Sequence, residues 1–240
     1  MISVLLLLSC TIVIVLSTQP VVSLHLCKTD NDVCVTNAVK AAYPLILQPN
    51  ENIGAKDMDP LYQEIIEGNL SALKFKFLNN TVLGFKTCEV QTAKFVDNNE
   101  DILRIDLLCP KFKLHGLYVI KGQLITIPIE GNGNYVLDTK KYSITVDLEL
   151  KTITKHGKSY KSIKGFKTKA EALEKVTYDL RNLFNGRQDL AEVVLKFANE
   201  HWKEVANDVQ YPVLTADIKK IVNNANAYLK TIPIDEYMVQ

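Results

Sequence analysis

The sequence lacks an excess of charge of either sign. Its 28 lysines and arginines nearly balance 27 aspartates and glutamates, which gives a formal net charge of +1. A protein that attracts nucleic acid or an anionic membrane through its overall field carries a clear positive excess. Composition therefore singles out neither partner, and we predict no binding to nucleic acid.

The sequence also lacks a recognisable catalytic motif. It has no His-Glu-x-x-His pair, no Gly-x-Ser-x-Gly elbow and no phosphate loop. Gly131-Asn132-Gly133 lacks the third glycine of a dinucleotide loop and precedes no predicted helix, so we interpret it as a turn. The four histidines are scattered along the chain, at His25, His115, His156 and His201. We predict no catalytic residue, no metal site and no cofactor.

Charged side chains are absent from the amino terminus, where the first is Lys28. The stretch from Val4 to Leu16 is almost wholly apolar, and Val21-Val22-Ser23 offers small residues for cleavage. We predict a secretory signal peptide over residues 1–23 and a single domain over residues 24–240. The alternative is an uncleaved anchor, for which the apolar run is short.

Cysteines are few, and removing the predicted signal peptide removes one of the five. The even number that remains suits an oxidising compartment. Two sequons, Asn69-Leu70-Ser71 and Asn79-Asn80-Thr81, predict N-glycosylation of Asn69 and Asn79 in a secreted chain. These signals together predict an extracellular glycoprotein, and nothing in the sequence requires more than a monomer.

The first two of these cysteines, Cys27 and Cys34, flank a cluster of helix-capping residues. A short helix is predicted over Val35 to Tyr43, ended by Pro44. A bridge between these cysteines would fix the amino terminus to that helix and contribute about 2–3 kcal/mol through loop entropy.

The chain from Leu70 to Phe85 predicts strands, because Leu73, Phe75 and Phe77 alternate with lysines and leucine before a turn at Asn79-Asn80. A second hairpin is predicted with a two-residue turn at Asn98-Asn99. In such a hairpin the residue numbers of each opposed pair sum to 197. That register predicts three opposed pairs: Cys88 with Cys109, Val90 with Leu107, and Thr92 with Ile105.

The hairpin register therefore predicts a cross-strand disulfide between Cys88 and Cys109, worth about 3 kcal/mol in the same loop model. Four cysteines allow three pairings, and two reduced, buried thiols are the alternative. Further strands follow at short spacing, over the ranges 112–120, 123–129, 135–137, 142–151, 163–169 and 176–183.

The stretch from Gln188 to Leu229 carries large apolar residues at three- and four-residue steps, the period of an amphipathic helix. A continuous helix of this length would be about 60 Å long. Pro212 predicts a kink within it. The order is short helix, antiparallel strands and long helix, which predicts an elongated α+β fold with a highly curved sheet wrapped around the long helix.

At this point several segments resemble the juvenile-hormone-binding and takeout family of insects. The similar segments cover nearly the whole mature chain in order: Cys27-x6-Cys34, residues 58–61 (MDPL), residues 109–118 (CPKFKLHGLY), residues 127–133 (IPIEGNG), residues 182–186 (NLFNG) and residues 197–202 (FANEHW). The resemblance implies an α/β-wrap fold, an internal apolar tunnel for a terpenoid or fatty-acid-like lipid, and a carrier that is not an enzyme. The position of the second cysteine pair favours the broader takeout-like branch over the hormone carriers themselves.

The tunnel implied by this resemblance needs wall residues and at least one polar group. Val193 and Phe197 could belong to the wall or to the simple core, and a tyrosine could supply the polar group. The candidate tunnel-lining residues are Val39, Tyr43, Phe75, Phe77, Tyr118, Tyr178, Val193 and Phe197.

A stripe over Lys151–Lys169 contains seven lysines and no acidic residue. One interpretation is a docking surface for an anionic membrane or a receptor, which gives the alternative function of this chain. The other is a solvated strand edge that lysines protect against aggregation. Ile153, Tyr160, Ile163 and Phe166 interrupt the charges and favour the second interpretation.

Overall fold

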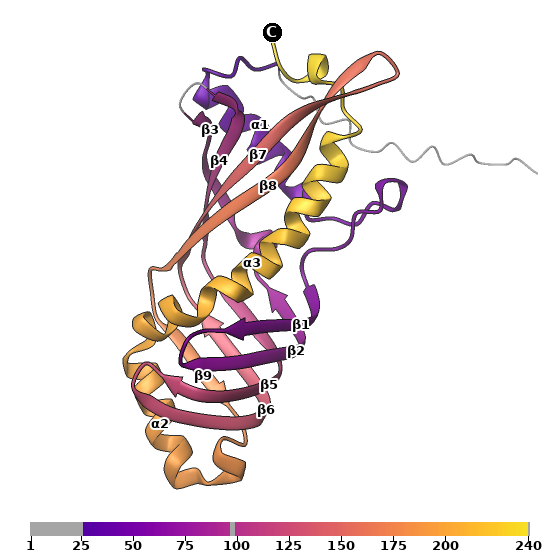
Figure 1. Cartoon of the computed structure of the whole chain (residues 1–240). Helices are drawn as coiled ribbons and strands as arrows, with labels where there is room; N and C mark the ends of the chain where they lie inside the picture. Colours follow the sequence, from indigo (N-terminus) through magenta and orange to yellow (C-terminus); the bar gives the residue numbers. More distant parts are fainter. Residues whose placement is uncertain (1–25, 97–98, 240) are drawn as a thin grey trace, which may run out of the picture.

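The computed structural model describes residues 26–96 and 99–239. The predicted signal peptide over residues 1–23 and Asn98 of the predicted turn lie outside these residues. The turn at Asn98-Asn99 is nevertheless wrong, because Asn99 belongs to a strand and lies opposite Val96. The described chain is elongated, with one antiparallel sheet in each half and a long helix running along both (Figure 1). This arrangement confirms the predicted α+β fold.

The five-stranded sheet occupies the half of the molecule that is lower in Figure 1. Leu73, Phe75 and Phe77 are buried while Lys74 and Lys76 between them are exposed, so the predicted alternation is confirmed. The strands are, in sheet order, β1 (Leu61–Asn69), β2 (Leu73–Leu83), β5 (Phe112–Leu124), β6 (Ile127–Thr139) and β9 (Val176–Leu180).

Several details of this sheet differ from the prediction. Gly131-Asn132-Gly133 is not a turn, because β6 runs through all three residues. The strand predicted over residues 123–129 is also wrong, because that range spans the turn between β5 and β6. Residues 61–69 form β1, although the sequence analysis assigned them no strand. The predicted turn at Asn79-Asn80 is wrong, because β2 continues through both residues with a bulge. Asn79 takes a positive φ of 50° at this bulge, which asparagine tolerates better than most residues.

The four-stranded sheet occupies the other half of the molecule (Figure 1). The Cys88–Cys109 disulfide beside its first hairpin is present, and the predicted register holds at Val90 opposite Leu107. A bulge then shifts the pairing, so Thr92 lies opposite Asp106 and not opposite Ile105 as predicted. The strands are β3 (Glu89–Val96), β4 (Asn99–Cys109), β7 (Tyr142–Lys155) and β8 (Lys158–Ala172).

The amino-terminal helix α1 (Asp32–Ile46) begins where the Asn31 side chain accepts a hydrogen bond from the amide of Cys34. The Cys27–Cys34 disulfide is present, as predicted. The predicted end of the helix at Pro44 is wrong, since α1 continues to Ile46 with Pro44 in its last turn. Short 3-10 helices lie at η1 (Glu51–Ile53), η2 (Phe85–Thr87), η3 (Phe184–Gly186) and η4 (Ile234–Glu236).

The long carboxy-terminal stretch forms two helices, α2 (Gln188–Glu200) and α3 (Trp202–Leu229). The break lies at His201, whose φ and ψ of −98° and 32° are not helical, and α3 runs through Pro212. The interruption of the carboxy-terminal stretch therefore lies at His201, where the sequence analysis predicted none. The change of direction at His201 lets α2 pack on β9 while α3 continues along β1, β8 and α1 (Figure 1).

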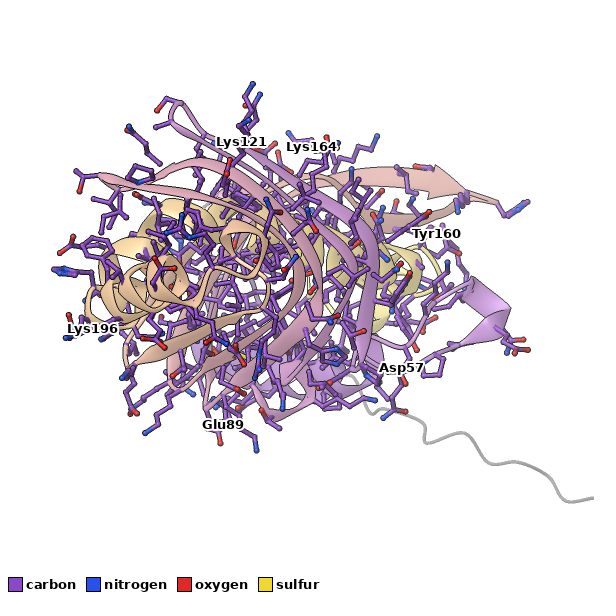
Figure 2. The ribbon with its side chains drawn as sticks, turned by 90° about the horizontal axis from the view of Figure 1, so that it is seen from below. Asp57, Glu89, Lys121, Tyr160, Lys164 and Lys196 are labelled. Atoms are coloured by element: carbon purple, nitrogen blue, oxygen red, sulfur yellow. A yellow bond between two sulfur atoms is a disulfide. The ribbon has the colours of Figure 1, made fainter. Side chains whose placement is uncertain are left out.

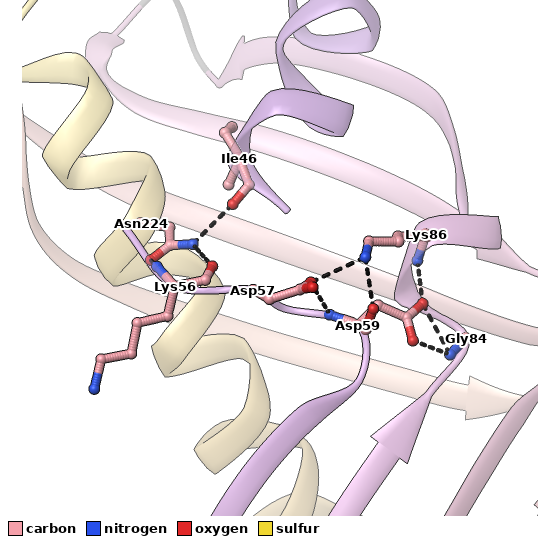
Figure 3. Close-up of polar contacts among 7 residues, drawn as sticks. All are labelled: Ile46, Lys56, Asp57, Asp59, Gly84, Lys86 and Asn224. Atoms are coloured by element: carbon pink, nitrogen blue, oxygen red, sulfur yellow. Dashed lines mark hydrogen bonds and ion pairs between the residues drawn. The ribbon is translucent and has the colours of Figure 1, made fainter. Parts of the chain in front are cut away.

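Asn224 fixes α3 to the segments that precede the first sheet, as Figure 3 shows. Its amide nitrogen donates to the carbonyls of Ile46 and Lys56 at 2.9 and 2.7 Å, and its oxygen accepts from the Lys56 amide at 3.2 Å. Nearby, the Asp59 carboxylate accepts from the amides of Gly84 and Lys86. These bonds join the long helix, the end of α1 and the turn before β3.

An Asn224→Ala variant is expected to lower the free energy of unfolding by about 2–4 kcal/mol, because it leaves two carbonyls and one amide without their partner in a buried site. Urea unfolding followed by the fluorescence of Trp202 measures the change. The neighbouring Asn223 is exposed, so Asn223→Ala is the matched control and should shift stability by less than about 0.5 kcal/mol. Equal effects of the two variants would contradict the role given to Asn224.

Candidate ligand-binding site

A cavity of about 250 Å³ with a mainly apolar wall lies inside the described residues, and we call it the α1 cavity. It lies between α1, the inner face of the four-stranded sheet, α3 and the carboxy-terminal residues. None of the side chains that line it is charged, and most are aliphatic. Such a wall offers a hydrophobic molecule burial without desolvating an ion.

Two smaller cavities continue into the half of the molecule formed by the five-stranded sheet. The central cavity has a volume of about 80 Å³ and the α2 cavity about 40 Å³. The two adjoin, because Phe77, Leu137, Tyr178 and Val209 line both. Together with the α1 cavity, they place unfilled apolar space along much of the interior.

A tyrosine and a phenylalanine stand between the α1 cavity and the central cavity. Tyr43 lines the first and Phe85 lines the second. The Tyr43 hydroxyl donates a hydrogen bond to the Phe85 carbonyl at 3.0 Å. Burial, with the Asp59 charge adding to it, raises the pKa of Tyr43 well above its usual value, so this hydroxyl keeps its proton.

The predicted tunnel-lining residues fall into two groups. Five line the cavities: Val39 and Tyr43 the α1 cavity, Phe77 and Tyr178 the central and α2 cavities, and Phe75 the α2 cavity.

The other three candidates line none of these cavities. Tyr118 is buried and donates to the Arg181 carbonyl at 2.8 Å. Phe197 is half-buried and stacks against the ring of His201 at 4.4 Å. Val193 is 61% exposed, so placing it on a cavity wall was wrong. The break at His201 turns α2 so that it buries Val194 and Ala198 instead.

The sequence analysis missed most of the α1 cavity wall. Ala38 and Ala42 on α1, and Ile218, Ile221 and Ala225 on α3, line this space. The three-residue and four-residue steps of α3 mark Ile218, Ile221 and Ala225 as one helix face. The small alanines are the signal that could have pointed to unfilled space, since they leave room between helix and sheet.

The central cavity contains a buried carboxyl group, Asp217 of α3, which is only 2% exposed. Its Oδ1 accepts a hydrogen bond from Nε2 of Gln63 at 3.2 Å. Burial raises the pKa of Asp217 from 3.8 to about 7, and the Gln63 bond and the Lys220 charge only partly oppose this shift. Sequence analysis did not predict the burial of Asp217, because an aspartate on a surface helix is usually solvated.

The unfolding free energy is expected to fall as pH rises from about 4 to about 7. In this window the folded protein keeps the Asp217 proton that the unfolded chain releases, so the slope reaches about −1.4 kcal/mol per pH unit and disappears above pH 7. Asp217→Asn should remove this slope, whereas Asp208→Asn, at an exposed position of the same helix, should keep it. Urea midpoints at pH 4.5, 6 and 8 measure the slope, and parallel profiles for all three proteins would contradict the assignment.

The lysine stripe over Lys151–Lys169 lies on β7 and β8. Lys161 is 6% exposed and so does not belong to the surface, and Lys167 lies 4.0 Å from Glu149. The other lysines are exposed, and the labelled Lys164 points outward in Figure 2. The stripe is therefore less continuous than the sequence suggests.

Within residues 26–96 and 99–239, no group of three or more histidine, cysteine or acidic side chains could hold a metal ion. No helix of those residues combines the length and apolarity that a membrane crossing requires. The described site consists of apolar cavities with one buried carboxyl group.

Two antiparallel sheets and a long helix packed along both, with apolar cavities between them, define a class of α+β binding proteins with an internal hydrophobic site. The chain belongs to the haemolymph juvenile hormone binding protein family, whose sequence profile matches residues 4–239. Proteins of this family are in general carriers of hydrophobic ligands.

Individual relatives agree with this assignment. The circadian clock-controlled protein daywake of Drosophila melanogaster and that of Drosophila yakuba are each 24% identical over 222 residues, covering 88% of this chain and 85% of the relative. The crystal structure of Takeout 1 from Epiphyas postvittana superposes with a TM-score of 0.83 at 25% identity, covering 90% of this chain and all of that one.

Proposed function

We propose that this protein is a secreted carrier that binds one small hydrophobic molecule, a terpenoid or a fatty-acid-like lipid, in the α1 cavity. The observation that carries the proposal is a cavity of about 250 Å³ whose wall holds no charged side chain. Its volume is close to the lower end of small-molecule sites, which span about 300–1,000 Å³. The family assignment supports the same function.

The expected affinity follows from buried area. A molecule of sesquiterpenoid size that buries about 400 Å² of apolar surface gains about 10 kcal/mol before costs. Association costs several kcal/mol, which leaves dissociation constants between micromolar and nanomolar. Such a protein would hold its ligand in transit and still release it.

Native mass spectrometry of the purified protein, offered juvenile hormone and fatty acids of matched length in competition, tests the proposal. A one-to-one adduct with either ligand supports the carrier and shows which class it prefers. Absence of a stoichiometric adduct with a broad panel of terpenoids, fatty acids and quinones would overturn it. In that case, salt-sensitive cosedimentation with anionic liposomes, lost in a Lys158→Glu/Lys164→Glu variant, would support the alternative in which the lysine stripe is a docking surface.

We further infer that the mature protein, residues 24–240 acting as one ligand-binding domain, is secreted and carries N-glycans. Asn69 at the end of β1 and Asn79 at the β2 bulge both have exposed side chains that a glycosyltransferase can reach. Expression in insect cells should give a mass that falls on enzymatic deglycosylation by two glycans. Each of Asn69→Gln and Asn79→Gln should remove one glycan, and an unchanged mass in either variant would exclude that site.

A further inference from the structure

Asp217 is a carboxyl group in a mainly apolar interior. The wall of the central cavity is formed mainly by large apolar side chains, among them Phe77, Phe85 and Val213. Placing a carboxyl group there costs free energy unless its oxygens find hydrogen-bond partners. The carboxyl group therefore needs an explanation that its own fold does not supply.

The protein satisfies only part of the hydrogen-bonding capacity of this carboxyl group. Gln63 donates to Oδ1, and the same Nε2 also donates to the Ala216 carbonyl at 2.8 Å. Lys220, one turn further along α3, directs its ammonium group to the Tyr62 carbonyl. Among the described residues no hydrogen bond reaches the second oxygen of Asp217. That oxygen can accept a hydrogen bond from a guest molecule.

A tyrosine whose pKa the Asp217 charge influences also donates its hydrogen bond elsewhere. Tyr135 comes from β6, and its pKa is raised first by burial and then by the Asp217 charge, so the two groups face a common low-dielectric region. The Tyr135 hydroxyl, however, donates to Oδ1 of the buried Asn80. It does not supply the missing donor for Asp217.

The other polar groups of the central cavity wall are bonded within the protein. Tyr142 donates to Oε1 of Gln210, and Tyr178 donates to the Trp202 carbonyl at 3.2 Å. Gln210 in turn donates to the Ala170 carbonyl at 3.0 Å. Thr139 accepts from the Phe112 amide at 3.0 Å. Among these described lining residues, Asp217 has an acceptor oxygen to which none of them donates.

Asp217 lies on the same helix as residues that line the α1 cavity. Asp217 lines the central cavity, and the next residue of α3, Ile218, lines the α1 cavity. The hydrogen bond between the Tyr43 hydroxyl and the Phe85 carbonyl lies between the two cavities, so a chain held in the α1 cavity would bring its end to Asp217 only where that bond opens. This arrangement suits a bound molecule whose apolar body lies in the α1 cavity and whose single polar end reaches Asp217.

We propose that Asp217 accepts a hydrogen bond from the hydroxyl group of an uncharged lipid, so that the protein selects a long-chain alcohol over the free fatty carboxylate. The inference rests on the proposed carrier function and names the chemical class of its ligand. A hydroxyl group donates to the carboxyl oxygen that lacks a partner. Above about pH 7, where Asp217 is ionised, a carboxylate end would instead place a second negative charge beside it in a low-dielectric site, which is unfavourable.

Competition between 1-hexadecanol and hexadecanoate at pH 8 tests this selectivity, since the two probes share one chain length and Asp217 is mostly ionised there. Displacement of a fluorescent apolar probe, checked by native mass spectrometry, gives both affinities. The wild-type protein is expected to prefer the alcohol by at least about tenfold, which corresponds to about 1.4 kcal/mol. This comparison of the two probes needs only the wild-type protein.

Asp217→Asn removes the charge with little change of shape, so it should raise the affinity for hexadecanoate and reduce the preference to less than about threefold. Asp208→Asn, at the exposed position of the same helix, should keep the wild-type preference. Equal binding of both probes by the wild-type protein, or an unchanged preference in Asp217→Asn, would overturn the inference and leave the carrier function standing. Failure to bind either probe or the fluorescent reporter would overturn the carrier function itself.

Discussion

An Ala42→Trp variant is expected to bind the ligand that the wild-type protein retains best at least about 100-fold more weakly, a loss of about 2.8 kcal/mol. Ala42 is half-buried on α1 and lines the α1 cavity. The indole ring would occupy space that a ligand needs, in a cavity of only about 250 Å³. Fluorescence titration, with native mass spectrometry for stoichiometry, measures the loss.

The neighbouring alanine provides a matched control for this variant. Ala41 is exposed and does not line the cavity, so Ala41→Trp should bind ligand as the wild-type protein does. Because Ala42→Trp fills empty space, its cost in stability should stay within the range of about 1–3 kcal/mol that is usual for larger side chains in a core. Retention of wild-type affinity by a folded Ala42→Trp protein would show that the α1 cavity is not the binding site.

Removing the Cys27–Cys34 disulfide is expected to speed ligand release by at least about tenfold. Cys27 donates its amide to the Tyr237 carbonyl at 3.1 Å and accepts from the Val239 amide at 2.9 Å. Cys27, Tyr237 and Met238 all line the α1 cavity. The disulfide thus fixes the segment that closes this end of the cavity, and a Cys27→Ser/Cys34→Ser variant should open it more often through local unfolding.

A variant without the second disulfide is the control, because removing that bond costs a similar amount of stability away from the α1 cavity. Loop entropy gives about 2–3 kcal/mol for Cys27–Cys34 and about 3 kcal/mol for Cys88–Cys109, which does not line the α1 cavity. Stopped-flow release of a fluorescent ligand from both double variants separates the two roles. Similar release rates in the two variants would contradict a closing role for Cys27–Cys34.

Local rules predicted much of the four-stranded sheet and the first helix. The register predicted for one hairpin was enough to place Cys88 near Cys109, because a hairpin is a local structure. The same locality explains why Asn31 caps α1 as its cluster of polar residues suggested. The bulge at Thr92 escaped these rules, since a bulge depends on how a strand fits its neighbours.

The sequence by itself determined many of the elements: alternating buried residues in β2, a helical carboxy-terminal stretch, two cysteine pairs and the motifs of the family. The tertiary structure alone decided the site. The turn at His201 exposes Val193, and the packing of α3 buries Asp217 beside an apolar cavity. A periodic pattern shows which face of an element is buried, whereas a cavity is the space that distant elements leave unfilled between those faces.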